Sequence, residues 1–289
     1  MDRTHHVPLR TDVQGAGERR GAALAKRVLS TLVLLPLFVA VVVAGPVWLF
    51  GVLIVLVSAL GQWEFTGMFE RAGVRPFRAL GLAGGVVVTA SFALPMSERL
   101  ALTAVVLAVF TASLWGRDGA RIDWGPAAVT LFGICYVNWL LGYGFWLRDL
   151  DAGPEWVLLL VWVTWVWETA AYLVGSAVGR RKLAPVISPN KTVEGALAQL
   201  VVSVLAALAA KAWFFGALTL REAVAVGLLL GVAGQIGDLV ESALKRSVGT
   251  KDTGRVIPGH GGILDRVDSL LFNAPVLFYY VTYGRLAGA

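Results

Sequence analysis

The chain has 289 residues, of which 57% are hydrophobic and 15% are charged, and its mean hydropathy is +0.72. Because soluble domains carry about 25% charged residues, this composition excludes an ordinary soluble globular protein and indicates a polytopic membrane protein. The formal net charge of +6 does not indicate nucleic-acid binding, since the basic residues are spread over short loops, where an anionic membrane surface accounts for them. The single cysteine, Cys135, excludes an intrachain disulfide.

The chain begins with a polar, basic stretch without periodicity, residues 1–27. We expect a disordered cytoplasmic arm there. The apolar run that follows has no small-residue cleavage site before it, which favours an uncleaved membrane anchor over a signal peptide.

Apolar runs of membrane-spanning length recur along the rest of the chain. We therefore expect an all-α fold, a polytopic integral membrane protein with about nine transmembrane helices. The predicted spans are residues 28–45, 46–62, 79–95, 100–115, 126–147, 156–178, 194–215, 222–243 and 263–283.

The lysines and arginines predict the orientation of these spans. Most of them fall on one side when the N-terminus is placed inside, and cytoplasmic loops carry an excess of such residues. The pattern thus predicts a cytoplasmic N-terminus and supports an odd number of spans. It also places the two loops richest in other polar groups, residues 179–192 and 245–262, in the cytoplasm. The basic residues on the other side are Arg99, Arg148, Lys211, Arg221 and Arg285.

Acidic side chains within the last predicted spans indicate a functional site, because an ionisable group inside a span costs about 2.5–3.5 kcal/mol on insertion. A polar face of the eighth span recurs at three- to four-residue spacing and consists of Gln235, Asp238, Glu241 or Ser242, and Lys245. Asp265 and Asp268 share a face at the start of the ninth. The sequence therefore predicts a polar surface on each of two consecutive helices.

These carboxylates are expected to form one cluster, which Glu168 of the sixth span and Glu194 of the seventh join. Carboxylate oxygens suit Mg²⁺, and carboxylates packed together need a cation because they otherwise repel one another. Several basic residues stand close by in the sequence: Lys245, Arg246, Lys251, Arg255 and Arg266. A metal ion with surplus cations is typical of a polyphosphate site.

A glycine-rich stretch, Pro-Gly-His-Gly-Gly at residues 258–262, leads into the ninth span. Backbone N–H groups of such a turn, at a helix N-terminus, bind phosphate. His260 fits either a phosphate contact or an ordinary turn residue, and both interpretations stay open. Glu64 lies at a span end, in GQWEFTGMF, and two interpretations of it also stay open: a solvated surface residue, or a member of the polar cavity.

Residues 242–268 read SALKRSVGTKDTGRVIPGHGGILDRVD, a pattern that closely resembles the signature of the phosphatidate cytidylyltransferase family, also called CDP-diglyceride synthases. The stretches GDLVES before it and SPNKTVEG at 188–195 are similar to further motifs of this family. The resemblance is specific over about 165–285 and rests on hydropathy and span count before that. It divides the chain into N-terminal membrane helices (about five), residues 28–155, and catalytic membrane helices with cytoplasmic motif loops, residues 156–289.

The resemblance implies a membrane enzyme of phospholipid biosynthesis that converts CTP and phosphatidate into CDP-diacylglycerol and pyrophosphate. It implies Mg²⁺, with a second cation as a further candidate, and a site facing the cytoplasm at a bacterial-type inner membrane. A homodimer is implied by the resemblance alone. The implied catalytic residues are Asp238, Lys251, Asp252, Asp265, Arg266 and Asp268. The implied substrate-binding residues are Ser188, Lys191, Thr192, Lys245, Arg246, Gly259, His260, Gly261 and Gly262.

The implied metal ligands are Asp238 and Asp265, with Glu168 and Glu241 as further candidates. The family usually has aspartate where this chain has Glu168, and glutamate reaches one methylene further, so the two aspartates are the stronger candidates.

Two other classes of membrane protein also use carboxylates near the membrane. A cation-coupled transporter predicts inverted repeats and charge at the midplane, whereas a lipid-alcohol kinase would release a nucleoside diphosphate in place of pyrophosphate.

Overall fold

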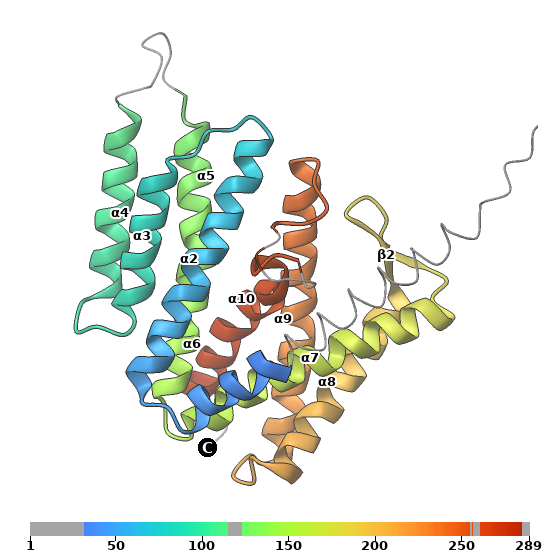
Figure 1. The fold of residues 1–289 in the computed structure, drawn as a ribbon. Coiled ribbons are helices and arrows are strands. Elements are labelled where there is room, and N and C mark those ends of the chain that lie inside the picture. The colour runs from blue at the N-terminus through green and yellow to red at the C-terminus, as the bar shows by residue number, and fades with distance from the viewer. Residues whose placement is uncertain (1–31, 115–122, 255, 257–260, 285–289) are drawn as a thin grey trace, which may run out of the picture.

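The computed structural model describes residues 32–114, 123–254, 256 and 261–284. The predicted arm, residues 1–27, lies outside the described residues. The described chain is mostly helical, and its connections over 72–77 and 248–254 lie at the same end of the molecule (Figure 1). The end of α2 and the start of the connection after α9 are therefore found at one end of the helix bundle.

The N-terminal helices stand side by side on one side of the molecule (Figure 1). Helix α2 packs along α3, and α3 packs on α4. Ser97 caps α4 by accepting the Leu100 N–H, which satisfies one of the free donors at a helix start. The bounds of this group are Leu32–Val43 for the first described helix, Val47–Arg71 for α2, Arg78–Ser91 for α3 and Glu98–Ser113 for α4.

The fifth predicted span is a continuous helical run whose centre is a π-helix. It consists of α5 (Gly125–Gly133), η1 (Ile134–Trp139) and α6 (Leu140–Asp149). Asn138 of η1 lies so close to α3 that a Cβ at Gly85 would stand 2.5 Å from its Oδ1. Wide π turns often occur at functional sites, and η1 also carries a residue that reaches the site described below.

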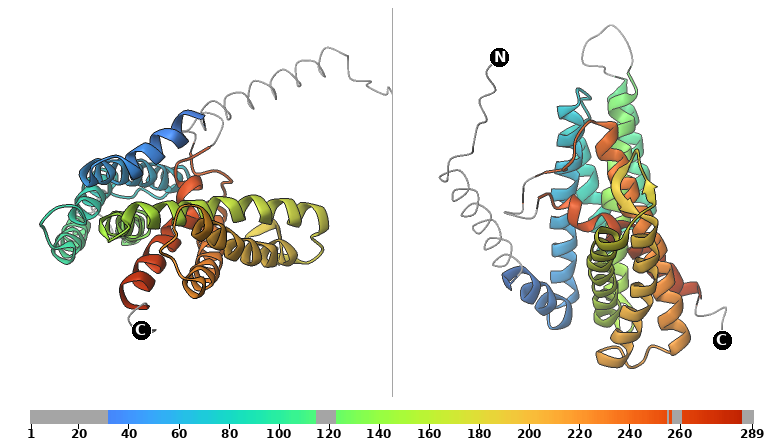
Figure 2. Two further views of the ribbon diagram at one scale, coloured as in Figure 1. Left: turned by 90° about the horizontal axis from the view of Figure 1, so that it is seen from below. Right: turned by 90° about the vertical axis from the view of Figure 1, so that its right-hand side faces the viewer.

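The C-terminal helices form a second group. Helix α7 (Gly153–Val178) packs on α8 (Val193–Trp213), α8 packs on α9 (Leu220–Ser247), and α9 packs on α10 (Leu264–Tyr279). A short π-helix, η2 (Tyr280–Gly284), continues α10. Helix α10 also contacts α2, α6 and α7, and it lies between the two groups of helices in every view (Figures 1 and 2).

The connection between α7 and α8 adds a short non-helical element to the mostly helical fold that the sequence predicts. It forms an antiparallel hairpin of β1 (Lys182–Ala184) and β2 (Ser188–Thr192), with Lys182 opposite Thr192 and Ala184 opposite Ser188. The sequence of this loop has no alternating apolar pattern from which strands could be predicted. The hairpin gives a defined shape to a segment in which several substrate-binding residues are predicted.

Five helical segments within the described ranges are long and apolar enough to cross a membrane: Val47–Arg71, Gly125–Asp149, Gly153–Val178, Val193–Trp213 and Leu220–Ser247. The other four predicted spans correspond to shorter described helices, so the structure supports an integral membrane protein without fixing the number of spans. Helix α2 continues nine residues past its predicted end at 62, because Gln62 and Glu64, which end the apolar run, are buried against other helices.

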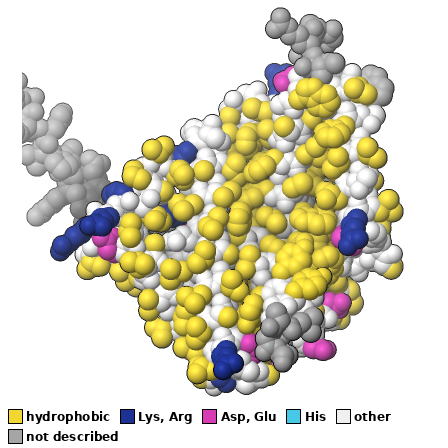
Figure 3. Space-filling view, turned by 180° about the vertical axis from the view of Figure 1, so that it is seen from behind, with side chains coloured by type: hydrophobic (Ala, Val, Ile, Leu, Met, Phe, Trp, Pro, Cys, Tyr) yellow, Lys and Arg dark blue, Asp and Glu magenta, His cyan; other side chains and the backbone are white. Residues whose placement is uncertain are grey.

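One face of the molecule is covered by hydrophobic side chains, with charged groups mainly around its margins (Figure 3). Exposed leucines and valines such as Leu107, Leu197 and Val201 belong to membrane-length or shorter apolar helices. A soluble protein rarely exposes an apolar surface of this extent, so this face is suited to contact with lipid.

Candidate active site

Asp265, at the start of α10, is held through both of its carboxylate oxygens. Its Oδ1 accepts a hydrogen bond from Lys245 Nζ of α9 at 2.8 Å. Its Oδ2 accepts from the Thr253 N–H at 3.1 Å, the Thr253 hydroxyl at 2.9 Å and the Gly262 N–H at 3.1 Å. The loop between α9 and α10 is thus folded around one carboxylate.

Lys245 joins this aspartate to a second carboxylate, Glu241, one turn earlier on α9. The Nζ–Oε2 distance is 2.8 Å, and the Glu241 side chain is 2% exposed. The other oxygen, Oε1, has no hydrogen-bond partner among the described residues. Because a buried charge without a counter-charge is strongly destabilising, the Lys245 ammonium is what allows these two carboxylates to lie side by side.

Further carboxylates gather next to this pair. Asp268 of α10 is 7% exposed and accepts the Ser269 N–H at 2.6 Å. Its charge interacts with those of Asp238 and Glu241 on α9, and Glu168 of α7 interacts with both aspartates. The structure therefore brings predicted carboxylates from three helices into one cluster. Glu194 is an exception: its carboxylate accepts the exposed backbone N–H groups of Arg180 and Arg181, so the expectation that it joins the cluster is wrong.

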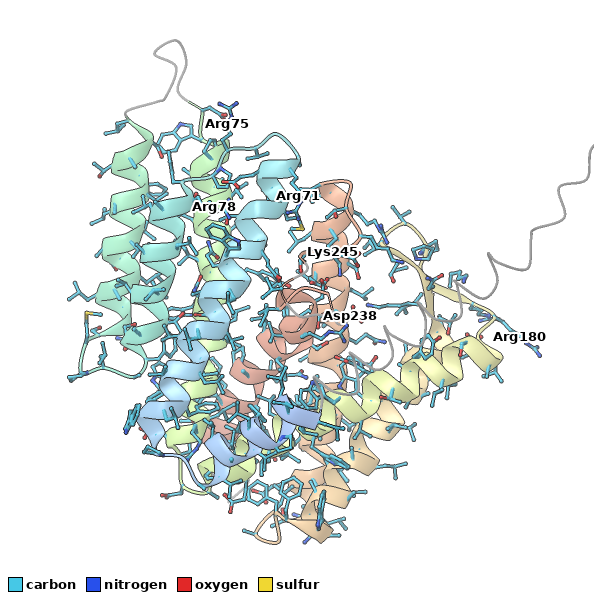
Figure 4. All side chains as sticks on the ribbon, viewed as in Figure 1. Arg71, Arg75, Arg78, Arg180, Asp238 and Lys245 are labelled. Carbon is cyan, nitrogen blue, oxygen red and sulfur yellow. The ribbon has the colours of Figure 1, made fainter. Side chains whose placement is uncertain are left out.

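Asp238 forms an ion pair with Lys191 of β2. Both side chains are partly buried, with exposed fractions of 29% and 24%. Figure 4 shows Asp238 and Lys245 at different heights along α9 in the centre of the molecule, whereas Arg180 lies at the outer edge, beyond α7. Two lysines from different segments therefore neutralise two of the predicted catalytic aspartates.

The hairpin positions the remaining residues predicted in the stretch 188–192. Ser188 pairs with Ala184 in the hairpin. Thr192 is 6% exposed, and its hydroxyl accepts the Gly195 N–H as the N-cap of α8. Thr192 thus has a structural contact that sequence reasoning did not separate from substrate binding.

Arg246 ties the end of α9 to the hairpin, because its Nε donates to the Ile187 carbonyl at 3.3 Å. Lys251 and Asp252 are exposed in the loop after α9, and no ion pair of either is found in the described part of the chain. Arg266 is exposed beside the cluster and interacts with the charge of Glu168. The loop cations are thus accessible from outside, while the carboxylates lie deeper.

The glycine-rich stretch is described only at its end. Gly259 and His260 lie outside the described residues, so their predicted roles stay predictions. Gly261 has a φ of +84°, a conformation that favours glycine, and Gly262 donates its N–H to Asp265. The end of the stretch binds the protein's own carboxylate in this structure.

Sequence reasoning missed two residues that reach this region, Tyr136 and Arg71, and left the role of a third, Glu64, open. Tyr136 of η1 is 5% exposed, its hydroxyl has no described partner, and it interacts with the charges of Glu241 and Asp268. Glu64 of α2 is 4% exposed and binds the loop before α10, as does Arg71 at the end of α2. Glu64 had been left undecided, and no pattern within α2 reveals its partner, which is 200 residues away.

A pocket of about 480 Å³ lies beside the carboxylate cluster, between the end of α2 and the loop. Its lining includes Trp63, Glu64, Arg71 and Thr253. The Arg78 guanidinium lies 3.3 Å above the centre of the Trp63 ring. The pocket shows that the loop borders open space on its α2 side as well.

The predicted Mg²⁺ fits the chemistry of these residues, since carboxylate oxygens are the ligands it prefers and Glu241 Oε1 is buried without a partner. No group of three or more acidic, histidine or cysteine side chains in the described ranges is arranged to hold a metal ion. Lys191 and Lys245 instead pair with the two aspartates predicted as ligands. Ion binding at either aspartate would therefore compete with a lysine.

The fold and the site define an integral membrane protein with a cluster of carboxylates and cations at the ends of its last helices. The chain belongs to the cytidylyltransferase family, whose model matches residues 25–284. The membership predicted from the signature segment is thereby confirmed, and with it a membrane nucleotidyltransferase.

Named relatives cover different shares of the chain. The uncharacterized protein YnbB of Escherichia coli (strain K12) is 32% identical over 272 residues, which cover 92% of this chain and 90% of that protein. The phosphatidate cytidylyltransferase of Staphylococcus aureus (strain COL) is 41% identical over 157 residues, and that of Staphylococcus haemolyticus (strain JCSC1435) is 40% identical over the same length. These two alignments span 54% of this chain and 60% of the relative.

Proposed function

We propose that the chain is a phosphatidate cytidylyltransferase, which converts CTP and phosphatidate into CDP-diacylglycerol and pyrophosphate. The observation that carries this proposal is the folding of the signature segment around Asp265, with Lys245 between Asp265 and Glu241. Family membership and the staphylococcal relatives support it. An arrangement of opposite charges near a lipid-facing surface suits a reaction between two polyanions, one of them a lipid.

In the proposed reaction, a phosphate oxygen of phosphatidate attacks the α-phosphorus of CTP. A new P–O bond forms there as the bond to the β-phosphate oxygen breaks in line, and pyrophosphate leaves with that electron pair. A phosphate monoester has a second pKa of about 6, so the nucleophile is already charged near neutral pH and needs no strong general base. The protein's task is to orient the reactants and offset their charge.

The basic side chains of the site are proposed to offset the charge of the reactants. Lys245, Arg246, Lys251 and Arg266 are proposed to contact phosphate oxygens, together with Lys191 of the hairpin. Asp238 and Asp265 would hold Mg²⁺, with Glu168 and Glu241 as further ligands. When bound, the ion supplies charge neutralisation between the phosphates and stabilises the leaving pyrophosphate.

The remaining predicted residues shape the site. Asp268 contributes to the field of the buried cluster, and Asp252 belongs to the exposed loop that CTP would meet first. Backbone N–H groups are proposed to bind phosphate at Gly259 and Gly261, beside His260, and Gly262 would do so only by exchanging Asp265 for phosphate as its acceptor. Ser188 and Thr192 would hold the hairpin at the edge of the site.

The proposal includes a topology. Phosphatidate would enter from the bilayer with its phosphate at the interface, while CTP arrives from the cytoplasm. We place the N-terminus and the site on the cytoplasmic side of a bacterial-type inner membrane, because basic loops are retained inside. A homodimer is a further part of the proposal.

The test is an assay of the purified, reconstituted protein with phosphatidate, Mg²⁺ and CTP labelled at the α-phosphate. We expect label in a liponucleotide together with pyrophosphate. Transfer of a γ-phosphate label to lipid with release of CDP would identify a lipid kinase instead. Ion-dependent transport without any lipid product would reject the enzymatic proposal.

A further inference from the structure

We propose that Glu64 of α2 is a positioning residue for the reaction, which orients the described ends of the α9–α10 connection, residues 253–254 and 261–264, and through them Asp265. The inference rests on the proposed function for its kinetic readout. It concerns a carboxylate of α2, outside the signature segment.

Glu64 caps the helix that carries Asp265. Its Oε2 accepts the N–H of Leu264, the first residue of α10, at 2.9 Å, and both side chains are buried. The first N–H groups of a helix have no partner within the helix, and Ile263, at the N-cap of α10, supplies no side-chain acceptor. A carboxylate from another helix, 200 residues away in sequence, therefore performs the capping.

Thr253 connects Glu64 to Asp265. This threonine is fully buried, and its hydroxyl lies 2.9 Å from Asp265 Oδ2 and 3.4 Å from Glu64 Oε2. Arg71, two turns further along α2, donates through Nη2 to the Thr253 carbonyl at 2.9 Å. Helix α2 thus holds the loop at Thr253 from two directions, and the same threonine donates to the predicted catalytic aspartate.

Two glycines of this connection, Gly254 and Gly262, are explained by this contact. A Cβ at Gly262 would collide with the Thr253 hydroxyl and would stand 2.6 Å from Glu64 Oε2 and 2.9 Å from Asp265 Oδ2. A Cβ at Gly254 would collide with Glu64 Oε1. The loop therefore lies against Glu64 so closely that two of its positions have no room for a side chain.

Substitutions at Glu64 test the positioning role. In Glu64→Ala the α10 cap is lost, and we expect kcat to fall about 10²-fold, the scale of a misplaced catalytic group, with a smaller change in KM for phosphatidate. Glu64→Gln keeps an oxygen for the Leu264 N–H and should recover most of the rate. The matched control is Glu70→Gln, on the same helix, whose described ion pair is with Arg78 and not with the loop.

A double-mutant cycle tests the connection through Thr253. Thr253→Val keeps the shape of the side chain and removes the hydroxyl. If Glu64 acts through this residue, the combined loss in Glu64→Ala/Thr253→Val is smaller than the product of the two single losses. Losses that multiply independently would overturn the pathway.

Hydrogen exchange provides a readout that does not depend on the reaction. In Glu64→Ala the amides of residues 253, 254 and 261–264 should exchange several-fold faster than in the wild type, while α3 and α8 stay unchanged. Unaltered exchange in this loop, or kcat within twofold of wild type in the alanine variant, would overturn the inference. If the wild-type protein forms no liponucleotide, the proposed function fails and the exchange result still decides whether Glu64 holds the loop.

Discussion

Lys245 on α9 and Asp265 on α10 are joined by a hydrogen-bonded ion pair of 2.8 Å, and the same ammonium contacts Glu241 at 2.8 Å. Two consecutive helices of the signature segment are therefore linked at the point where one ends and the other begins. The first predictions concern this link.

Lys245→Met should destabilise the protein as well as inactivate it. The substitution leaves Glu241 and Asp265 without their counter-charge, and breaking a buried ion pair of this kind costs about 3–5 kcal/mol. Thermal unfolding in detergent measures the effect. In Lys245→Met/Glu241→Gln part of the stability should return, because only Asp265, which keeps its Thr253 and Gly262 donors, then lacks the ammonium. The activity should not return. Equal stability of Lys245→Met and the wild type would contradict the role assigned to the ammonium.

Asp265→Asn should remove most of the turnover, by about 10²–10³-fold, the range found when a key electrostatic contact is deleted. The amide keeps an oxygen for the loop donors, so the protein should stay folded and inserted. Liponucleotide formation and size-exclusion behaviour are the measurements. Asp149→Asn, at the distant end of α6, is the control and should retain wild-type activity. Full activity of Asp265→Asn would exclude Asp265 from the site.

Lys191→Met should strengthen binding of a divalent ion if Asp238 is a ligand. The lysine now pairs with Asp238, so its removal eliminates a competitor for that carboxylate. Binding of Mn²⁺ as a probe for Mg²⁺, followed by electron paramagnetic resonance, measures this without an activity assay. We expect a lower dissociation constant in Lys191→Met and loss of binding in Asp238→Asn. An unchanged constant in both variants would place the ion elsewhere.

Thr192→Ala should affect stability more than catalysis. Its hydroxyl is the N-cap of α8, and loss of such a cap costs about 0.5–2 kcal/mol. A melting curve and the KM for CTP separate the two roles. A large rise in that KM with unchanged melting would restore the substrate-binding role predicted from the sequence.

The sequence predicted the site best where its contacts are local. The spacing of Asp238, Glu241 and Lys245 fixes a common helix face, and α9 forms as expected. The apolar runs located the helices, but the membrane-crossing number could not be derived, because α3 and α4 are only 14 and 16 residues long. The apolar run ends at Gln62, so the last turns of α2 were not predicted. Their polar side chains are buried by tertiary contacts.

Long-range contacts account for the rest. Nothing in the pattern around Tyr136 indicates that a π-helix buries this side chain where it interacts with the charges of Glu241 and Asp268. Nothing around Thr192 reveals a strand that ends as a helix cap. Glu194 was expected in the cluster because it follows a motif, but its oxygens accept the backbone N–H groups of Arg180 and Arg181, just before β1. These arrangements depend on which segments meet in space, and a single sequence does not contain that information in readable form.

The hydrogen bonds from α2 to Thr253 and Leu264 have a consequence for how the molecule can be divided. A fragment cut at residue 155 would retain the whole signature segment, yet it would lack Glu64 and Arg71, which α2 alone supplies. Such a half should be inert by itself and should regain turnover when the missing half is co-expressed with it. The amino-terminal helices are then part of the working enzyme, and a chimaera that exchanges them must preserve both contacts.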